Sequence, residues 1–241
     1  MNYLKFGNSK KFLVFLHGWG ADLNSFLWLK DYFIDEYSLV FVDFLGFGKS
    51  EKLTVPYFVS DYVFELKKIL NKFDIDELVL IGHSFGGRVA IKFAFLFDKI
   101  FNKLSLVLVD SAGVRPKRNL VYYWKVWRYK ILKSKVIANK KPKQFLEKFG
   151  SEDYKNLSGV MKQTFINVVN EDLCVYAKNL NVKTLIFWGK NDKDTKLYMA
   201  HKLHRLIKGS KLEIVEDAGH FSFLDKKEDF VIILDTFLKN I

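Results

Sequence analysis

The segment that most restricts the fold of this chain is Gly82-His83-Ser84-Phe85-Gly86-Gly87, a G-x-S-x-G motif. It follows an apolar run at 78–81 and precedes a helix-like stretch from Arg88, so it lies between a predicted strand and a predicted helix. Such a sharp turn strains the backbone of its central serine, and flanking glycines let neighbouring backbone pass closely. We therefore expect the turn to present Ser84 above the carboxyl edge of a sheet, beside a helix N-terminus that favours negative charge.

Short apolar runs alternate with amphipathic stretches of helical length. The predicted strands are 12–16, 39–43, 78–82, 104–109, 184–188 and 212–215. Apolar residues at three- and four-residue spacing predict helices at 25–34, 59–72, 86–97, 196–207 and 226–239. Most of the strand runs are apolar on both faces, which fits a buried parallel sheet. Strand followed by helix, repeated along the chain, predicts a doubly wound α/β fold.

One interval interrupts this alternation. Between Ser111 and about Ala177 no strand-like run appears, only a helical pattern, and the interval is far longer than an ordinary connection. We interpret it as an inserted helical cap at 112–177, which divides the core into 1–111 and 178–241. The chain has 241 residues, 49% of them hydrophobic, which is enough for one α/β unit with an insertion.

A serine hydroxyl becomes an effective nucleophile only when a base accepts its proton. Of the five histidines, His220 lies in the loop directly after the last predicted strand, at the same sheet edge as Ser84. The acid that orients such a histidine falls between serine and histidine in chain order. Asp192, which also follows a predicted strand, is the first candidate, and Asp194 and Asp110 are the alternatives.

The turn His17-Gly18-Trp19-Gly20 follows the first strongly apolar strand. We expect the backbone amides of Trp19 and Phe85 to form a two-donor oxyanion hole, which stabilises negative charge on an acyl oxygen. The candidate residues of an apolar acyl pocket are Trp19, His83, Trp124, Trp127, Phe221 and Phe223.

The motifs in this order resemble the α/β-hydrolase fold family over essentially the whole chain, most closely its serine carboxylesterases with a helical cap. The segment Asp43-Phe44-Leu45-Gly46-Phe47-Gly48-Lys49-Ser50 is similar to a further loop of the family. The resemblance implies a mostly parallel sheet with helices on both faces, and Ser84 as nucleophile, Asp192 as acid and His220 as base.

The chain departs from the family pattern at three points. Leu45 replaces a proline, and no proline follows Asp192, which leaves the position of the acid open by a residue or two. Only residues 1–10 precede the first strongly apolar strand, too few for the two leading strands of many members. We therefore expect a reduced sheet of about seven strands.

The predicted reaction is hydrolysis of a carboxylic ester or thioester through an acyl-enzyme. Members of the fold that act on haloalkanes or epoxides use an aspartate nucleophile, which Ser84 argues against. Carbon–carbon bond hydrolases of the meta-cleavage type are an alternative, although they usually carry asparagine at the position of His83 and tryptophan at that of Phe221. Nucleotide binding through Gly48-Lys49-Ser50 is disfavoured because Asp43 stands where a phosphate-binding loop needs glycine.

The net charge of +12 is concentrated in the predicted cap. Residues 113–148 hold twelve basic side chains and one acidic one, for a local charge of +11. The simplest interpretation is a lid helix with solvated charges. The alternatives are docking to an anionic membrane surface, or to an acidic carrier protein that delivers a tethered acyl ester. A complete set of triad residues argues against nucleic-acid binding without catalysis.

The residues indicate no metal or cofactor. Cys174 is the only cysteine and reads as a packing residue, and His201 and His204 lack a third ligand. The longest apolar runs are about five residues, whereas a membrane-spanning helix needs about twenty. No signal-peptide pattern occurs at the N-terminus, so we expect a cytoplasmic protein that acts on a small-molecule or acyl-chain ester.

Overall fold

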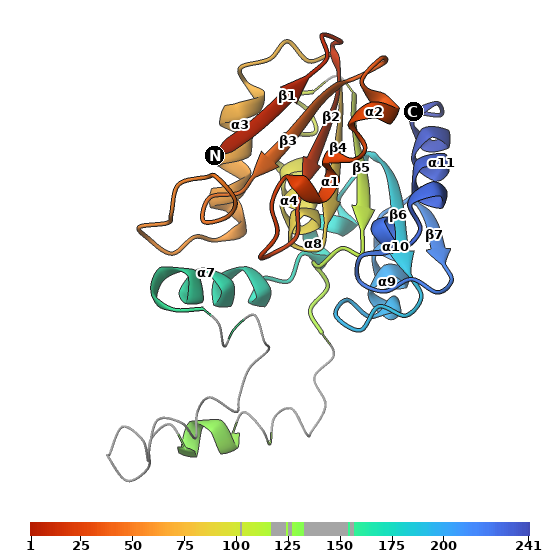
Figure 1. Ribbon diagram of the computed structural model, residues 1–241. Coiled ribbons are helices and arrows are strands. Elements are labelled where there is room, and N and C mark those ends of the chain that lie inside the picture. The colour runs from red at the N-terminus through yellow and green to blue at the C-terminus, as the bar shows by residue number, and fades with distance from the viewer. Residues whose placement is uncertain (102, 117–123, 125–126, 133–153, 155–156) are drawn as a thin grey trace.

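One central sheet organises the computed structural model, which describes residues 1–101, 103–116, 124, 127–132, 154 and 157–241 (Figure 1). Its seven strands in this part of the chain follow the order β1-β3-β2-β4-β5-β6-β7. They are β1 (Asn2–Phe6), β2 (Lys11–Leu16), β3 (Ser38–Asp43), β4 (Glu77–His83), β5 (Lys103–Val109), β6 (Lys183–Gly189) and β7 (Lys211–Val215). All neighbours pair in parallel except β1 and β3, which are antiparallel. The prediction of a mostly parallel sheet of about seven strands is confirmed.

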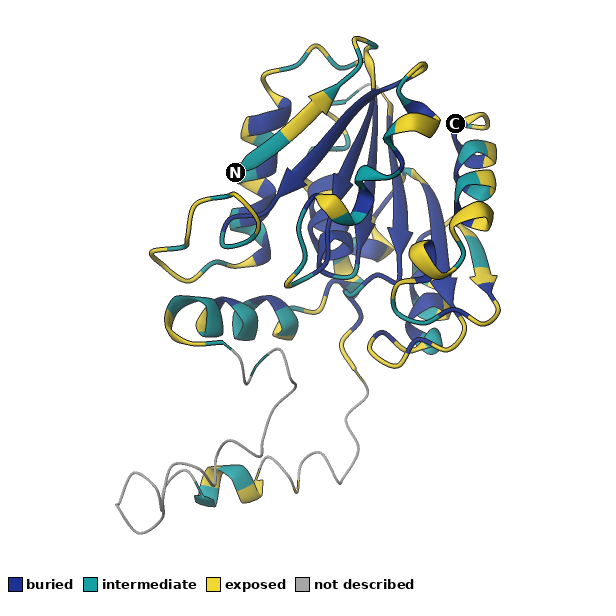
Figure 2. Ribbon diagram, viewed as in Figure 1, coloured by how far each residue is buried: buried dark blue, intermediate teal, exposed yellow. Residues whose placement is uncertain are grey.

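The strand that the sequence pattern missed is β1. Its five residues are half-buried or exposed because it lies at the edge of the sheet, so it lacks the continuous apolar run of the inner strands. By contrast, all six residues of β3 are buried, and the inner strands are buried along nearly their whole length (Figure 2).

Helices cover both faces of the sheet (Figure 1). The helices that lie wholly within the described residues are α1 (Asn24–Leu27), α2 (Lys30–Phe33), α3 (Val59–Leu70), α4 (Phe85–Phe97), α7 (Gly159–Asn170), α8 (Cys174–Lys178), α9 (Leu197–Leu206), α10 (Ser222–Asp225) and α11 (Lys227–Leu238). The predicted helix at 25–34 is divided into α1 and α2, whereas the other four predicted helices begin and end within two residues of α3, α4, α9 and α11.

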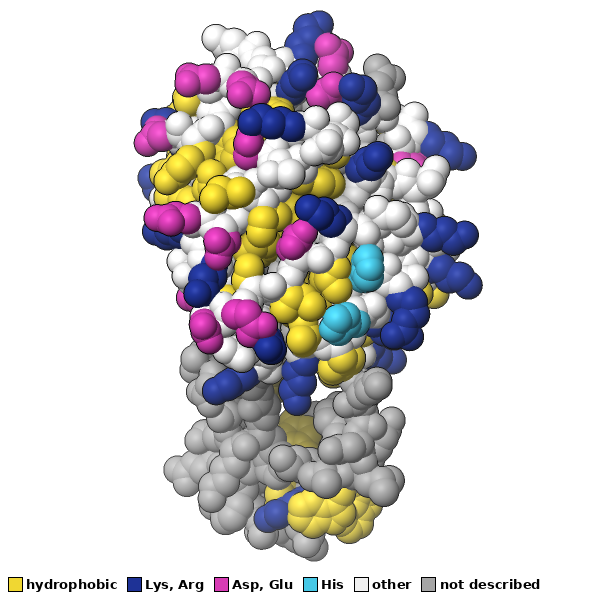
Figure 3. All heavy atoms as spheres, turned by 90° about the vertical axis from the view of Figure 1, so that its right-hand side faces the viewer, with side chains coloured by type: hydrophobic (Ala, Val, Ile, Leu, Met, Phe, Trp, Pro, Cys, Tyr) yellow, Lys and Arg dark blue, Asp and Glu magenta, His cyan; other side chains and the backbone are white. Residues whose placement is uncertain are grey.

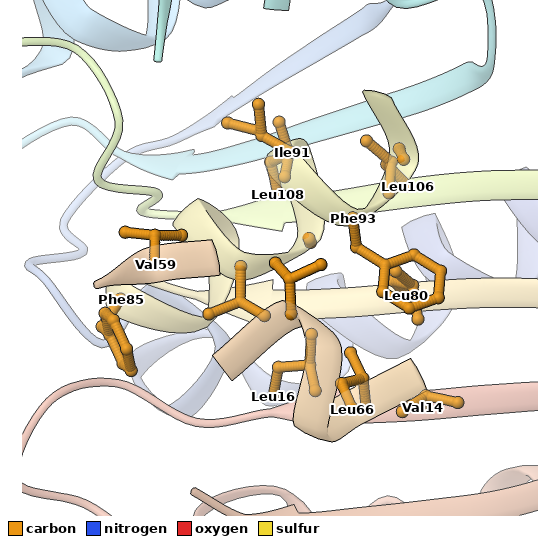
Figure 4. Packing of buried hydrophobic residues seen from close by; sticks show 14 of the residues in the cluster. Val14, Leu16, Val59, Leu66, Leu80, Phe85, Ile91, Phe93, Leu106 and Leu108 are labelled. Carbon is orange, nitrogen blue, oxygen red and sulfur yellow. The ribbon is translucent and has the colours of Figure 1, made fainter. Parts of the chain in front are cut away.

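The alternating side chains of each strand supply two separate cores. In β2, Val14 and Leu16 pack on the face covered by α3, α4 and α9, whereas Leu13 and Phe15 pack on the face covered by α1, α10 and α11. On the first face, Leu66 of α3 lies against the strand side chains (Figure 4). Burying one such side chain stabilises the fold by about 1.5–3 kcal/mol, so both faces hold the strands rigidly in place.

The turn after β3 is held by Asp43. Its carboxylate accepts hydrogen bonds from the amides of Leu23 at 2.8 Å and Lys49 at 2.9 Å. A Cβ atom on Gly48, which has φ +52°, would lie 2.4 Å from this carboxylate. The Gly48-Lys49-Ser50 segment therefore wraps around an aspartate, as expected of a structural turn rather than a phosphate-binding loop.

The interval between β5 and β6 contains α7 and α8, and α7 lies below the carboxyl ends of the strands in Figure 1. About half of the predicted cap at 112–177, and most of its basic side chains, lie outside the described residues. Its boundaries and its charge therefore stay predictions.

The face that carries α9, α11 and β7 presents charged side chains of both signs around hydrophobic ones (Figure 3). His201 and His204 are exposed on α9, and the Nδ1 atom of His204 lies 2.9 Å from the Ser210 hydroxyl. Within the described part of the chain, no helix combines the length and the hydrophobicity needed to cross a membrane.

Candidate active site

Ser84 lies in the sharp turn between β4 and α4, with backbone angles of φ 49° and ψ −108°. This left-handed backbone is unfavourable for a residue with a side chain. It is held because the Ser84 amide donates to the Val109 carbonyl at 3.0 Å and the Ser84 carbonyl accepts from the Ala112 amide at 3.0 Å. A Cβ atom on Gly86 would lie 2.0 Å from the Leu16 carbonyl oxygen, so only glycine lets α4 approach the end of β2 this closely.

Loops at the carboxyl ends of β4, β6 and β7 bring Ser84, Asp192 and His220 together. The Nε2 atom of His220 lies 3.0 Å from the Ser84 Oγ atom, and its Nδ1 atom lies 2.9 Å from Oδ2 of Asp192. Ser84 and His220 are 136 positions apart in the chain, and they meet because the parallel sheet places the loops that carry them at the same edge. With Nδ1–H donating to the carboxylate, Nε2 is free to accept the serine proton.

Thr195, which the sequence reasoning did not single out, orients Asp192. The Thr195 hydroxyl donates to Oδ2 of Asp192 at 2.6 Å, and the Thr195 amide donates to Oδ1 at 2.9 Å. The Asp194 amide donates to the same Oδ1 at 2.8 Å. In a recurrent type of turn, an aspartate side chain accepts hydrogen bonds from the backbone amides two and three residues later. This turn pattern is the sequence signal that could have pointed to Thr195.

The ionisation of His220 and Asp192 is coupled. Burial lowers the pKa of His220, but the hydrogen bond to Asp192 and the charge of its carboxylate outweigh burial, so the pKa lies above the usual 6.5. Burial raises the pKa of Asp192, but hydrogen bonds from His220 and Thr195 outweigh burial and hold the pKa below the usual 3.8. Asp192 is therefore ionised at neutral pH and favours positive charge on the imidazole.

The two alternative acids do not reach His220. Asp194 is exposed, and it contacts Asp192 through its amide rather than its carboxylate. Asp110 is buried at the end of β5, where its carboxylate accepts hydrogen bonds from Gly189 and Ser222. Burial raises the pKa of Asp110 to about 7. Of the three candidates, Asp192 is thus the one whose carboxylate bonds to the imidazole.

Among the described residues, Asp192, Asp194 and His220 also form the one group of three whose potential metal-ligand atoms lie within 4.8 Å of one another. Both ring nitrogens of His220 already face Ser84 and Asp192. The arrangement therefore suits proton transfer better than metal coordination.

Trp19 and Phe85, whose amides are the predicted oxyanion donors, both line the cavity over Ser84. Phe85 is the first residue of α4, and an amide at that position has no acceptor inside its own helix. A Cβ atom on Gly18 would lie 3.5 Å from the Cβ atom of Ser84, so the turn that leads into Trp19 passes against the serine. Both predicted donors thus lie on segments next to Ser84.

The cavity over Ser84 has a volume of about 490 Å³. Phe165 and Val168 of α7 line it, and the Phe165 ring packs on the Trp19 ring at 5.1 Å between centroids. Arg88 of α4 also lines this cavity, and among the described residues that line it Arg88 is the one lysine or arginine. The site therefore combines apolar surface, the serine and one fixed positive charge.

The predicted pocket residues divide into two groups. Trp19, His83 and Phe221 line the cavity. The other three do not: Phe223 is fully buried beneath the loop, and Trp124 and Trp127 are 54% and 59% exposed. An aromatic residue near the site in sequence can thus pack in the core or face solvent, which its sequence position does not reveal.

His83 supports the loop that carries the candidate base. Its Nε2 atom donates to the His220 carbonyl oxygen at 2.7 Å, and its Nδ1 atom has no hydrogen-bond partner among the described residues. Burial and the neighbouring His220 lower the pKa of His83 to about 3, so its ring is neutral. A neutral ring with the proton on Nε2 fits the hydrogen bond to the His220 carbonyl oxygen and leaves Nδ1 without a proton.

Comparison with known proteins gives the same fold. A family model described as "Alpha/beta hydrolase family" matches residues 13–232. The chain is 25% identical to the proline iminopeptidase of Saccharolobus solfataricus over 275 residues, which cover 97% of this chain and 86% of that protein. An esterase from Exiguobacterium antarcticum superposes with a TM-score of 0.75 at 26% identity, over 98% of this chain and 94% of the other. A meta-cleavage product hydrolase from Pseudomonas fluorescens IP01 superposes with a TM-score of 0.73 at 18% identity, over 99% and 94%.

Proposed function

The chain belongs to the alpha/beta hydrolase family, and from this premise we propose that it is a serine hydrolase that cleaves a carboxylic ester or thioester. The observation that carries the proposal is the single imidazole of His220 placed between the Ser84 hydroxyl, at 3.0 Å, and the Asp192 carboxylate, at 2.9 Å. The similarity to an esterase at 26% identity supports the substrate class.

In the proposed reaction, Ser84 Oγ attacks the acyl carbonyl carbon while His220 Nε2 accepts the hydroxyl proton. Asp192 holds the imidazole in the correct tautomer and stabilises its positive charge. The amides of Trp19 and Phe85 donate hydrogen bonds to the oxyanion of the tetrahedral intermediate.

Collapse of this intermediate breaks the ester bond, and His220 gives its proton to the departing alcohol or thiol. Water then attacks the acyl group on Ser84. His220 accepts a proton from this water and returns it to Ser84 Oγ, which releases the carboxylic acid and restores the enzyme.

Two measurements test the proposal. The first is hydrolysis of p-nitrophenyl esters of increasing acyl length. We expect turnover of those esters whose acyl chain fits a cavity of about 490 Å³. The second is labelling by a fluorophosphonate probe, which Ser84→Ala should abolish while Ser60→Ala, a serine on α3, keeps it. Undiminished labelling of Ser84→Ala would contradict the assignment. Cleavage of carbon–carbon bonds in a meta-cleavage product, with no ester turnover, would favour that alternative.

A further inference from the structure

Arg88 is a buried cation beside the candidate nucleophile. It lies four residues after Ser84 on α4, which is about one helical turn or 6 Å along the axis. Only 5% of its surface is exposed, and it lines the same cavity as Ser84 and His220. An arginine in this position is costly to bury unless its charge is compensated.

The direct contacts of Arg88 among the described residues are with neutral carbonyl groups, and the charges of Glu171 and of the exposed Asp172 favour its charged form without an ion pair. Its guanidinium donates to the carbonyl oxygen of Glu171 at 2.8 Å and to that of Val169 at 3.4 Å, both at the end of α7. Within the described part of the chain, no carboxylate forms an ion pair with it. The Glu171 carboxylate instead pairs with Lys92, which lies one further turn along α4.

Arg88, Lys92 and Glu171 therefore form a largely buried cluster with two positive charges and one negative charge. Burial lowers the pKa of Arg88 to about 10, although the charges of Glu171 and Asp172 act in the opposite direction, so it remains charged at neutral pH. A guanidinium has five N–H groups, and its hydrogen bonds to the described residues use two of them. Their planar arrangement matches the two oxygens of a carboxylate.

We propose that Arg88 binds a free carboxylate group of the substrate, so that the preferred substrates are esters or thioesters that also carry a carboxylate. This inference rests on the proposed function, because it names the substrate class of the same site. One carboxylate matches the single excess positive charge, whereas a phosphate dianion exceeds it. Asp194 also lines the cavity, but it is exposed, so water and salt screen its repulsion of an anionic substrate.

The first test uses two substrates that differ in this charge and in one methyl group: p-nitrophenyl hydrogen glutarate, which ends in a carboxylate, and its methyl ester, which ends in a neutral group. We expect the wild-type enzyme to show a kcat/KM at least about 10-fold higher for the carboxylate substrate. A ratio of one or below for both this pair and the leaving-group pair that follows would overturn the proposal, and these measurements need no variant. A second pair, 4-acetoxybenzoate and its methyl ester, places the carboxylate on the leaving group and so distinguishes the two sides of the ester bond. A preference for the carboxylate in this pair alone would support the proposal, with the charge on the alcohol rather than on the acyl group.

The second test uses Arg88→Met, which keeps the length of the side chain but removes its charge. We expect the ratio of the two kcat/KM values to fall by about 10–100-fold, and Arg88→Lys to restore part of it. The control is Arg205→Met, an exposed arginine on α9, which should leave the ratio unchanged. An equal loss on both substrates in Arg88→Met would mean that Arg88 only holds the end of α7, and would overturn the proposal.

A binding measurement separates this inference from the proposed function. Monoethyl glutarate should bind to Ser84→Ala in calorimetric titration, and binding should weaken by about 10-fold or more in Ser84→Ala/Arg88→Met. If no ester is hydrolysed and no probe labels Ser84, but this difference persists, the proposed function fails and the carboxylate site stands. If esters are hydrolysed but diethyl and monoethyl glutarate bind alike, the carboxylate site fails and the hydrolase stands.

Discussion

The carboxylate of Asp110 holds Ser222 by two hydrogen bonds, from the Ser222 amide at 3.0 Å and from its hydroxyl at 2.5 Å. Ser222 lies two residues after His220, so this contact ties the histidine loop to the end of β5. The other oxygen of Asp110 accepts from the Gly189 amide at 2.8 Å, three residues before Asp192. One buried carboxylate thus connects the two loops that carry the candidate base and acid.

Asp110→Asn should therefore loosen both loops. An asparagine keeps the size of the side chain, but its NH₂ group faces N–H donors and cannot accept their hydrogen bonds. We expect the free energy of unfolding to fall by about 1–3 kcal/mol in chemical denaturation at pH 8. We also expect a lower kcat. Asp194→Asn, at an exposed position, should leave stability within about 0.5 kcal/mol of wild type. A variant as stable as wild type would show that the Asp110 contacts do not hold the loops.

Asp192→Asn should lower kcat by about 10³–10⁴, because the wrong tautomer of His220 is then favoured. The measurement is steady-state hydrolysis of the best p-nitrophenyl ester. The matched controls are Asp194→Asn and Asp110→Asn, neither of which changes the side chain bonded to the imidazole. If either control causes the larger loss, the acid is assigned to the wrong residue.

Thr195→Val should reduce kcat by about 10-fold, because it removes the hydroxyl that donates to Oδ2 of Asp192 at 2.6 Å and keeps the shape of the side chain. Thr195→Ser retains the hydroxyl and should recover most of the activity. Equal activity of the valine and serine variants would mean that the amides of Asp194 and Thr195 orient the carboxylate without help from the hydroxyl.

The pH dependence of kcat/KM should report His220. Only the neutral imidazole accepts the serine proton, so activity should rise with pH through a midpoint above 6.5, since the charge and hydrogen bond of Asp192 raise this pKa. In Asp192→Asn the raising interaction is lost while burial, which lowers the pKa, remains. The midpoint should therefore move to lower pH in that variant. A midpoint that does not move would assign the titration to another group.

The sequence alone was sufficient for the fold. The six predicted strand runs, the five predicted helices and the G-x-S-x-G turn are local patterns, and residues that are near one another in the chain decide them. The runs at 78–82 and 184–188 match β4 and β6 to within one residue at each end. The missed strand β1 and the divided helix at 25–34 depend on weaker local signals, because β1 is an edge strand and α1 and α2 are short.

Which side chains meet was decided by the tertiary structure. The sequence ranks Asp192 first but leaves Asp194 and Asp110 open as the acid, and only the packing of the loops after β5, β6 and β7 decides that the Asp192 carboxylate bonds to His220. The tertiary structure also decides where Trp124 and Phe223 lie. Both are aromatic, as expected of pocket residues, but Trp124 is exposed and Phe223 is buried in the core. The role proposed for Arg88 could not be found from the sequence at all. It depends on which groups the guanidinium contacts among the described residues, carbonyl oxygens at the end of α7 rather than a carboxylate, and these contacts form only when the sheet and α7 pack together.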